Sequence, residues 1–431
     1  MATLIKNISS LCTLANGNKL FRTGKEMQNV SEIKNGAILF SDKIEFTGTT
    51  AEVENHITTN NITVENTIDA KGKTIIPGFC DSHTHIIFAG NRSGEFARRL
   101  RGTTYQELAA EGGGILTTVK ATKNAMYKDL VESGKKLAIS AMKHGTTSIE
   151  IKSGYSLTTD GELKQLRAIK RLKDDLPMNV RATFMGAHAF PPEYKNDRQK
   201  YVDLLVNEMI PAVAEEKLAD YCDAFIDEGY FTNEDARAIF EAAQKYGMKI
   251  RTHSDELADV GAAGFSADIG AVSADHLLFA SDESIAKMAA SGTVATMMPT
   301  TSYFIQMKYA PARKIIDAGC IAALATDCNP GSSFTENMQL VLSLAVFNLG
   351  MTAEEALTAA TINSAKAMDL SDITGSLDIG KQADFVIADV ESYIDLFYHF
   401  GVNHISEVWF KGQQVNFANY LNSNNNNKNK K

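Results

Sequence analysis

Two histidines, His83 and His85, are separated by one residue and follow a short apolar run, Thr74–Ile76, which crosses Pro77 and Gly78. The apolar run predicts a strand with chemistry at its end. Residues i and i+2 of a strand lie on one face, so both imidazoles should point the same way and offer two ligands to a metal ion. The alternative is a polar strand end whose two histidines are only hydrogen-bonded.

Seven further apolar runs are predicted to be strands, and amphipathic stretches separate them. These strands are Thr146–Ser153, Val180–His188, Tyr221–Glu228, Lys249–Ser254, Ala271–His276, Thr293–Pro299 and Ile321–Asp327. Helices are predicted at Asp160–Lys173, Asn233–Tyr246 and Ser281–Ala290, and Thr232 with Asp235 has the spacing of a capping box. Eight strands alternating with helices predict an α/β fold, a (β/α)8 TIM barrel. A doubly wound sheet is the alternative, but no Gly-rich phosphate loop follows the first strand.

Chemistry-capable residues close several of these strands, where a parallel barrel gathers its catalytic groups. Five of the nine histidines do so, and carboxylates close two more strands. These residues are His83, His85, His188, Asp227, Glu228, His253, His276 and Asp327. Because so many predicted strands end in such residues at the same end of the barrel, a shared functional site is favoured over isolated structural histidines.

Three imidazoles and a carboxylate, from His83, His85, His253 and Asp327, form a ligand set suited to one Zn²⁺ or Fe²⁺ per chain. His276 and Glu256 remain as proton carriers. Glu256 lies three residues after His253, about one helical turn into the next helix if that helix starts at once. Its alternative role is an ordinary first-turn carboxylate that the helix dipole stabilises.

The net charge of −9 and a pI near 5.6 argue against nucleic acid or an anionic membrane as partner, since both favour a clustered positive surface. We therefore expect a small-molecule substrate. The five cysteines lack CxxC spacing, and the sequence shows neither an export signal nor an apolar run approaching the ~18 residues of a membrane span. These features predict a cytoplasmic protein with reduced thiols.

Both chain ends have short strand-like runs broken by turns, and neither is long enough to form its own core. We expect residues 1–75 and 376–421 to combine into one small β-sandwich domain beside a barrel of residues 76–375. The Asn- and Lys-rich tail, residues 422–431, cannot bury apolar surface and is expected to be disordered.

Several motifs at these positions resemble the amidohydrolase superfamily of metal-dependent barrels. They are PGFCDSHTH (Pro77–His85), THSDE (Thr252–Glu256), SADH (Ser273–His276), ATDCNPGS (Ala325–Ser332) and GSLDIGKQADFVIAD (Gly375–Asp389). Motifs of one branch of the superfamily are FAGNRSGEF (Phe88–Phe96), RGTTYQELAAEGGGILTTVKATKNA (Arg101–Ala125), EIKSGYSL (Glu150–Leu157) and FMGAHAFPPEY (Phe184–Tyr194). The similarity covers the chain except its tail.

The resemblance implies one metal ion, because binuclear members usually add a strand-four lysine and Tyr221–Glu228 has none. It implies that Glu256, His276 and Asp327 are catalytic. It places six residues around the substrate, namely Arg92, Tyr155, His188, Asn329, Gly331 and Ser332. A solvated loop charge at Arg92 and an aromatic lid residue at Tyr155 are the alternatives.

The implied activity is hydrolysis of a cyclic amide in an anionic small molecule, by a homodimer. Three other functions stay open. A nucleobase deaminase would use the same ligands without a carboxylate-binding arginine. A non-catalytic scaffold would have lost ligands that this sequence keeps. A binding protein would hold the same small molecule without turning it over.

Overall fold

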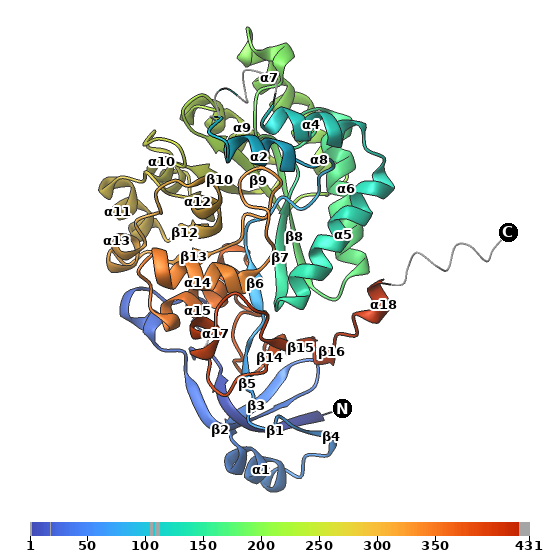
Figure 1. Cartoon of the computed structure of the whole chain (residues 1–431), viewed down its shortest axis with the longest axis vertical. Coiled ribbons are helices and arrows are strands. Elements are labelled where there is room, and N and C mark those ends of the chain that lie inside the picture. The colour runs from blue at the N-terminus through green and yellow to red at the C-terminus, as the bar shows by residue number, and fades with distance from the viewer. Residues whose placement is uncertain (1, 18, 104–106, 108–112, 422–431) are drawn as a thin grey trace, which may run out of the picture.

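The computed structural model describes residues 2–17, 19–103, 107 and 113–421, and its strands form two sheets (Figure 1). One sheet contains eight parallel strands in sequence order. They are β6 (Phe79–Asp81), β7 (Thr146–Lys152), β8 (Asn179–Ala187), β9 (Tyr221–Ile226), β10 (Lys249–Ser254), β11 (Ser273–His276), β12 (Val294–Met297) and β13 (Ala322–Leu324). An isolated bridge between Thr84 and Cys328 joins the chain after β6 to the chain after β13. The predicted (β/α)8 barrel is therefore confirmed.

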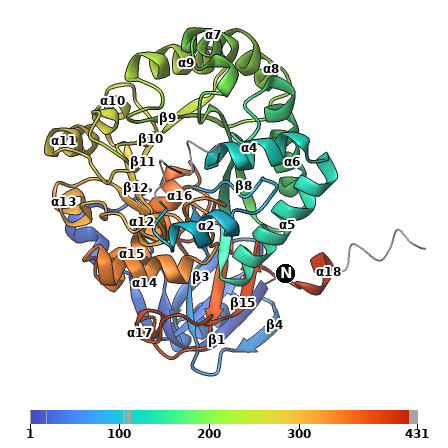
Figure 2. The same cartoon turned by 45° about the horizontal axis from the view of Figure 1, so that its top comes forward.

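Helices surround this barrel, and Figure 2 shows α5 to α11 and α13 as an outer ring. Helix α1 (Thr50–Thr59) lies instead against β2 and β3 of the other sheet. The further α-helices of the described residues are α2 (Ser93–Arg99), α4 (Ile115–Asn124), α5 (Tyr127–Lys143), α6 (Thr159–Asp175), α7 (Arg198–Leu204), α8 (Ile210–Glu215), α9 (Asn233–Lys245), α10 (Ala262–Asp268), α11 (Asp282–Ser291), α12 (Pro299–Ile305), α13 (Ala312–Asp317), α14 (Met338–Asn348), α15 (Ala353–Ala360), α16 (Ile362–Ala367), α17 (Asp395–Tyr398) and α18 (Ala418–Leu421).

Helix α9 illustrates how local sequence sets these elements. Thr232 and Asp235 form the predicted capping box at its N-terminus, so two of its free N–H groups are satisfied. Ile239, Phe240 and Ala243 recur at helical spacing and are buried in the core of the barrel. Helices α7 and α11 of the outer ring are also capped by a side chain, from Asp197 and Ser281, and both bury apolar residues against the barrel.

The second sheet is mixed and uses both ends of the chain, as expected. Its strands are β1 (Ala2–Cys12), β2 (Glu32–Phe40), β3 (Ile44–Thr49), β4 (Val64–Asp69), β5 (Thr74–Pro77), β14 (Phe385–Ala388), β15 (Ile405–Phe410) and β16 (Gln413–Gln414). Strand β5 pairs with β1 on one side and with β14 on the other. A C-terminal strand thus completes a sheet that the N-terminal strands begin.

The stretch predicted as one strand from Thr74 onward is divided between the two sheets. Strand β5 belongs to the mixed sheet and β6 to the barrel, with Gly78 between them. A Cβ on Gly78 would lie 2.2 Å from the Thr147 hydroxyl of β7, so the crossover requires glycine. His83 and His85 follow β6 and do not lie within it, and this part of the prediction was wrong.

We propose the domain division expected from the sequence, with residues 1–75 and 376–421 in the sheet domain and residues 76–375 in the barrel. The crossover at Gly78 lies close to that boundary. The expected disordered tail, residues 422–431, and part of the Arg101–Ala125 motif lie outside the described residues.

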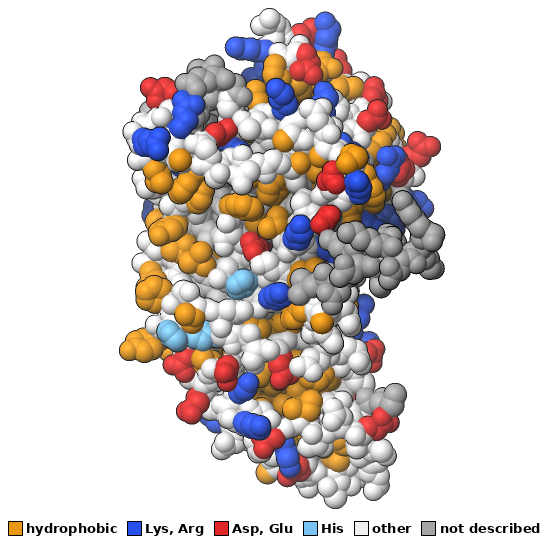
Figure 3. Space-filling model, turned by 45° about the vertical axis from the view of Figure 1, so that its right-hand side comes forward, with side chains coloured by type: hydrophobic (Ala, Val, Ile, Leu, Met, Phe, Trp, Pro, Cys, Tyr) orange, Lys and Arg blue, Asp and Glu red, His pale blue; other side chains and the backbone are white. Residues whose placement is uncertain are grey.

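Among the described residues, no helix is both long and apolar enough to span a membrane. On the face shown in Figure 3, acidic and basic side chains are interspersed over both the upper and the lower part of the molecule. The five cysteines are buried and none is in a disulfide, as predicted.

Candidate metal centre and substrate cavity

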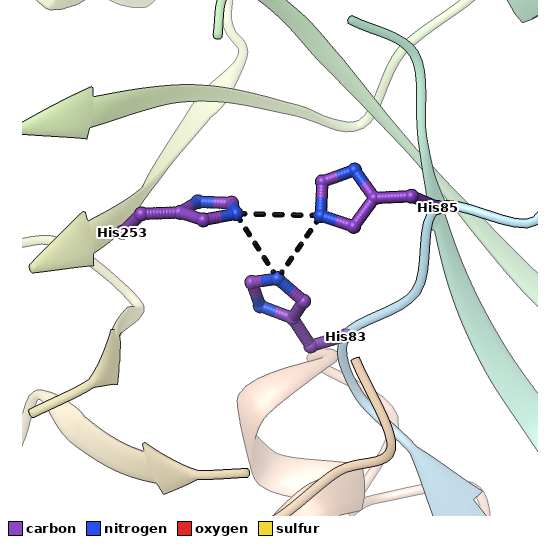
Figure 4. A group of neighbouring side chains, drawn as sticks. All are labelled: His83, His85 and His253. Atoms are coloured by element: carbon purple, nitrogen blue, oxygen red, sulfur yellow. Dashed lines mark hydrogen bonds between the residues drawn. The ribbon is translucent and has the colours of Figure 1, made fainter. Parts of the chain in front are cut away.

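Three imidazoles converge at the C-terminal end of the barrel, two from the segment after β6 and one from β10 (Figure 4). The Nε2 atoms of His83 and His253 lie 3.1 Å apart, and each lies 3.3 Å from Nε2 of His85. Four tetrahedral ligands at about 2.0–2.1 Å from an ion lie roughly 3.3–3.4 Å from one another. The triangle therefore has the size of one face of such a site.

The protonation of these rings fits a metal better than a hydrogen-bonded cluster. Nδ1 of His83 lies 2.7 Å from Asp275 and Nδ1 of His253 lies 3.1 Å from Asp223, so each donates to a carboxylate. Burial lowers the pKa of both histidines, so the rings are neutral and each Nε2 carries a lone pair. No proton is left to bridge the two Nε2 atoms, and a cation satisfies both.

Asp327 lies beside these imidazoles, where it could offer a fourth donor. Its Oδ1 lies 3.6 Å from Nε2 of both His83 and His85, and its Oδ2 accepts a hydrogen bond from the Thr301 hydroxyl at 2.7 Å. Burial raises the pKa of Asp327 to about 7, and a divalent cation would favour the ionised form. Its φ of +50° is unusual for a non-glycine residue and is held by the surrounding contacts.

Buried ion pairs inside the barrel support two of the imidazoles. Asp275 also accepts from Arg251 at 3.2 Å, and Asp223 lies 2.9 Å from the ammonium of Lys152. Lys152 is also 2.9 Å from Glu150, and none of these side chains is exposed. Both carboxylates are therefore paired with a cation on one side and a histidine on the other.

The sequence analysis missed this layer of charges, although a signal was present. Arg251 lies two residues before His253, and Lys152 lies two residues after Glu150. Asp223 of β9 lies opposite Arg251 of the neighbouring strand β10. Alternation in a strand places residues i and i+2 on one face, so charges at these positions point into the barrel beneath the ligands.

His276 and Glu256 lie together beside the cluster. His276 is within 4.8 Å of the donor atoms of His83 and Asp327, and its Nε2 lies 3.5 Å from Oε2 of Glu256. Burial, with the charges of Asp327 and Asp227, raises the pKa of Glu256 well above its usual value. This carboxyl group can therefore hold a proton at neutral pH.

Glu256 does not lie in a helix, because the helix that was expected to start directly after His253 begins later. Helix α10 begins only at Ala262, because the Asp255 carboxylate accepts from the N–H groups of Val260, Ala262 and Ala263 and delays its start. The Asp227 carboxylate accepts from the N–H groups of Glu256, Leu257 and Ala258. Two carboxylates thus hold the loop that carries Glu256, and the helix-dipole alternative does not apply.

A cavity of about 700 Å³ opens onto the cluster. Its lining includes His85, His253 and Asp327, the proposed proton carriers His276 and Glu256, and the six predicted substrate-binding residues Arg92, Tyr155, His188, Asn329, Gly331 and Ser332. His83 lies deeper. The structure therefore brings all twelve predicted site residues to one place.

The histidine at the end of β8 presents a hydrogen-bond acceptor to this cavity. Nδ1 of His188 lies 3.1 Å from the carbonyl of Gly154 and must donate to it, which leaves the lone pair on Nε2. Burial lowers the pKa of His188 to about 4, so the ring is neutral at pH 7. The rings of His85 and Tyr155 pack against it.

Asn329 shapes the turn after β13. Its Oδ1 accepts from the N–H groups of Gly331 and Ser332, and its Nδ2 donates to the carbonyl of Asp327 and to the Ser332 hydroxyl. The hydrogen-bonding capacity of its amide is taken up by these contacts. We therefore propose that Asn329 acts by placing Gly331 and Ser332 at the cavity wall.

A parallel barrel with a His₃Asp cluster at its C-terminal face defines a metal-dependent hydrolase. The sequence model of the Amidohydrolase family matches residues 74–415, and the chain belongs to this family. It carries the divalent-metal site of that fold, which the described residues fit.

Within the family, the chain is similar to curated imidazolonepropionases. It is 45% identical over 412 residues to the imidazolonepropionase of Geobacillus sp. (strain WCH70), covering 95% of this chain and 97% of the relative. It is 43% identical over 417 residues to that of Christiangramia forsetii, covering 96% of this chain and 100% of the relative.

Among solved structures, the chain resembles a zinc-bound adenosine deaminase from Xanthomonas campestris, with a TM-score of 0.70 and 17% identity over 97% of this chain and 96% of the other. It also resembles a guanine deaminase from C. acetobutylicum with bound guanine, with a TM-score of 0.67 and 16% identity over 96% and 100% of the two chains. Identities this low show a shared fold alone.

Proposed function

We propose that the chain is an enzyme of histidine degradation that hydrolyses 4-imidazolone-5-propanoate to N-formimidoyl-L-glutamate. Similarity to imidazolonepropionases over 95% of the chain supports this function. The structural observation behind this proposal is that one cavity is lined both by residues of the metal cluster and by an arginine, Arg92. The cluster suits the ring amide, and the arginine suits the propionate.

We propose that His83, His85, His253 and Asp327 hold one divalent ion. The ion, when bound, supplies a Lewis acid that polarises the ring carbonyl and makes water a stronger nucleophile near neutral pH. The oxygen of water bonds to the carbonyl carbon, the bond from that carbon to the ring nitrogen breaks, and the nitrogen takes up a proton. The chain must therefore move protons as well as bind the ring.

Proton transfer is assigned to three residues. The donor atoms of Asp327 and His276 lie within 4.8 Å of each other and of His83, and Glu256 is 3.5 Å from His276. We propose that His276 and Asp327 take the proton from water, and that Asp327 relays it to the departing nitrogen. Glu256, with its raised pKa, exchanges a proton with His276 and the substrate.

Substrate recognition is assigned to other residues that line the same cavity. Arg92 is the proposed partner of the propionate, because a guanidinium holds a carboxylate through two parallel hydrogen bonds. The acceptor Nε2 of His188 suits a ring N–H group, and Tyr155 packs beside His188. Ser332 offers a hydroxyl at the same wall.

The test mixes purified protein with 4-imidazolone-5-propanoate and follows the loss of imidazolone absorbance, with the product identified by mass. The proposed function predicts turnover and formation of N-formimidoyl-L-glutamate. Release of ammonia from nucleobases, without imidazolone turnover, would point to a deaminase. Saturable binding without any absorbance change would point to a binding protein.

Metal content should be measured on the same sample. Three imidazoles and one carboxylate suit Zn²⁺ and Fe²⁺ alike, and we propose that one ion of either kind supports activity. Strand β9 contains no lysine, and Lys152 of β7 is engaged by Glu150 and Asp223, which supports a single ion. Nearly two tightly held ions in an active sample would contradict this.

We also propose a cytoplasmic homodimer. Free, buried cysteines are compatible with a reducing compartment, and the dimer is expected by analogy with the family. Light scattering of the purified protein would separate a dimer from a monomer.

A further inference from the structure

Glu95 lies in α2, one helical turn after Arg92. The Nε atom of Arg92 donates to Oε2 of Glu95 at 2.9 Å, and the two side chains are only 10% and 16% exposed. A hollow of about 270 Å³ beside the substrate cavity is lined by both residues and shares Arg92 and Gly331 with that cavity. Glu95 thus lies behind Arg92 and outside the lining of the substrate cavity, which includes proposed metal ligands.

Glu95 is itself anchored to a second helix. Its Oε1 accepts from the Thr117 hydroxyl of α4 at 2.7 Å, and its Oε2 accepts from the N–H group of Gly114 at 3.3 Å. Burial alone would raise the pKa of Glu95, but the Thr117 hydrogen bond and the charge of Arg92 outweigh it, and the pKa is lowered. The carboxylate is therefore ionised and held in one orientation.

These contacts select one edge of the guanidinium for a ligand. Glu95 occupies the edge that contains Nε. On the other side, Nη1 lies so close to Gly331 that a Cβ there would be 2.1 Å from it. A guanidinium offers five donors in a fixed fork, and Glu95 takes only the one on Nε, so the Nη donors remain for a second carboxylate, with room beside Nη1 because residue 331 is glycine.

We propose that Glu95 is a positioning residue that orients the guanidinium of Arg92 for the substrate carboxylate. This inference rests on the proposed function, in which Arg92 binds the propionate. The Arg92–Glu95 pair is neutral overall, but Arg99 also lines the cavity, so the aim of the Arg92 donors adds to the positive charge in favouring a carboxylate.

Glu95→Gln is the direct test, because it removes the charge and one carboxylate oxygen with little change in size. We expect KM for the imidazolone propionate to rise roughly tenfold or more, as when one charge-assisted hydrogen bond is lost, with kcat and metal content close to wild type. With an analogue whose side chain ends in a neutral amide, KM of the wild type and the variant should be equal. A purely structural role would lower kcat and stability and would affect both substrates alike.

Two further variants make the test specific. Glu216→Gln is the matched control, because Glu216 accepts from Nε of Arg167 at 2.9 Å on the outside of the barrel, and it should leave KM unchanged. The second is the pair of changes Arg92→Ala and Glu95→Gln. If Glu95 acts through Arg92, then Glu95→Gln should have no further effect once Arg92 is absent.

The outcomes separate this inference from the proposed function. If wild type does not hydrolyse the imidazolone, the proposed function fails. If wild type is active and Glu95→Gln leaves KM unchanged, or if the two changes are additive, the positioning role is wrong. Should Glu95→Gln fold poorly, Thr117→Val removes one anchor of Glu95 and leaves its contact with Arg92. It should raise KM by a smaller factor with kcat unchanged, and an unchanged KM would overturn the inference.

Discussion

Replacing Asp223 with Asn tests whether the buried ion pairs tune the metal site. Asp223 accepts from Nδ1 of His253 at 3.1 Å and lies 2.9 Å from Lys152, with no exposure to solvent. The asparagine keeps the shape and can still accept from Nδ1 of His253, but it loses the negative charge that makes the imidazole a stronger ligand. Loss of such a partner typically costs 10–100-fold in metal affinity, or about 1.4–2.8 kcal/mol.

The fold should survive this change, because Lys152 keeps Glu150 at 2.9 Å and no buried cation is left alone. The assay is an equilibrium competition between the metal-free protein and a chromophoric chelator. Asp174→Asn serves as the control, because Asp174 is an exposed carboxylate on α6. A dissociation constant within twofold of wild type would refute the reasoning. A loss of several kcal/mol in unfolding free energy of the metal-free protein would show a structural role instead.

Five further variants test the other assignments. His253→Ala should lose most metal and activity together, as measured by elemental analysis and turnover, because one of four donors is removed. His276→Ala should keep the metal and lose roughly 10²–10⁴ in kcat, and wild-type rates from about pH 6 to 9 would contradict its role. Arg92→Ala should cost on the order of 2–5 kcal/mol in kcat/KM, and Arg92→Lys less, with little further loss on the neutral amide substrate. Gly331→Ala should push the guanidinium of Arg92 aside and raise KM, with unfolding measurements showing only a small cost, because a flexible side-chain end can move.

The barrel and the cluster could be predicted because both depend on local pattern. Apolar runs of strand length alternated with stretches of helical periodicity, and several strands ended in histidine or a carboxylate, which are residue types that bind metals or transfer protons. His276 indeed ends β11, and His253 is the last residue but one of β10. Asp327 lies just beyond β13, and its predicted strand was too long by three residues at that end. Strand pairing stops before the turn that bends Asp327 inward, and no propensity marks that point.

The division of the Thr74–Asp81 stretch could not be predicted in the same way. Both halves are apolar strands, and only their partners distinguish them. Strand β5 pairs with β14 from the far end of the chain, while β6 pairs with β7. Such partners depend on contacts between residues distant in sequence, which a local pattern does not contain. The role of Asp227 was missed for the same reason, since its carboxylate accepts from a loop about thirty residues further along the chain. The anchoring of Glu95 by Gly114 and Thr117 likewise depends on the fold, although its contact with Arg92 is local.

The closure of the barrel through the segment after β6 has a consequence for how the protein is made. His83 and His85 leave the ribosome early, yet the N–H of His85 finds its partner only when the carbonyl of Cys328 has been synthesised. Asp327, the last donor, arrives at the same moment. Until Asp327 is made, a nascent chain carries only part of the proposed donor set, first two imidazoles and then, from His253 on, three. We therefore expect loading of the metal ion to be a late event, coupled to completion of the barrel and not to its first strand.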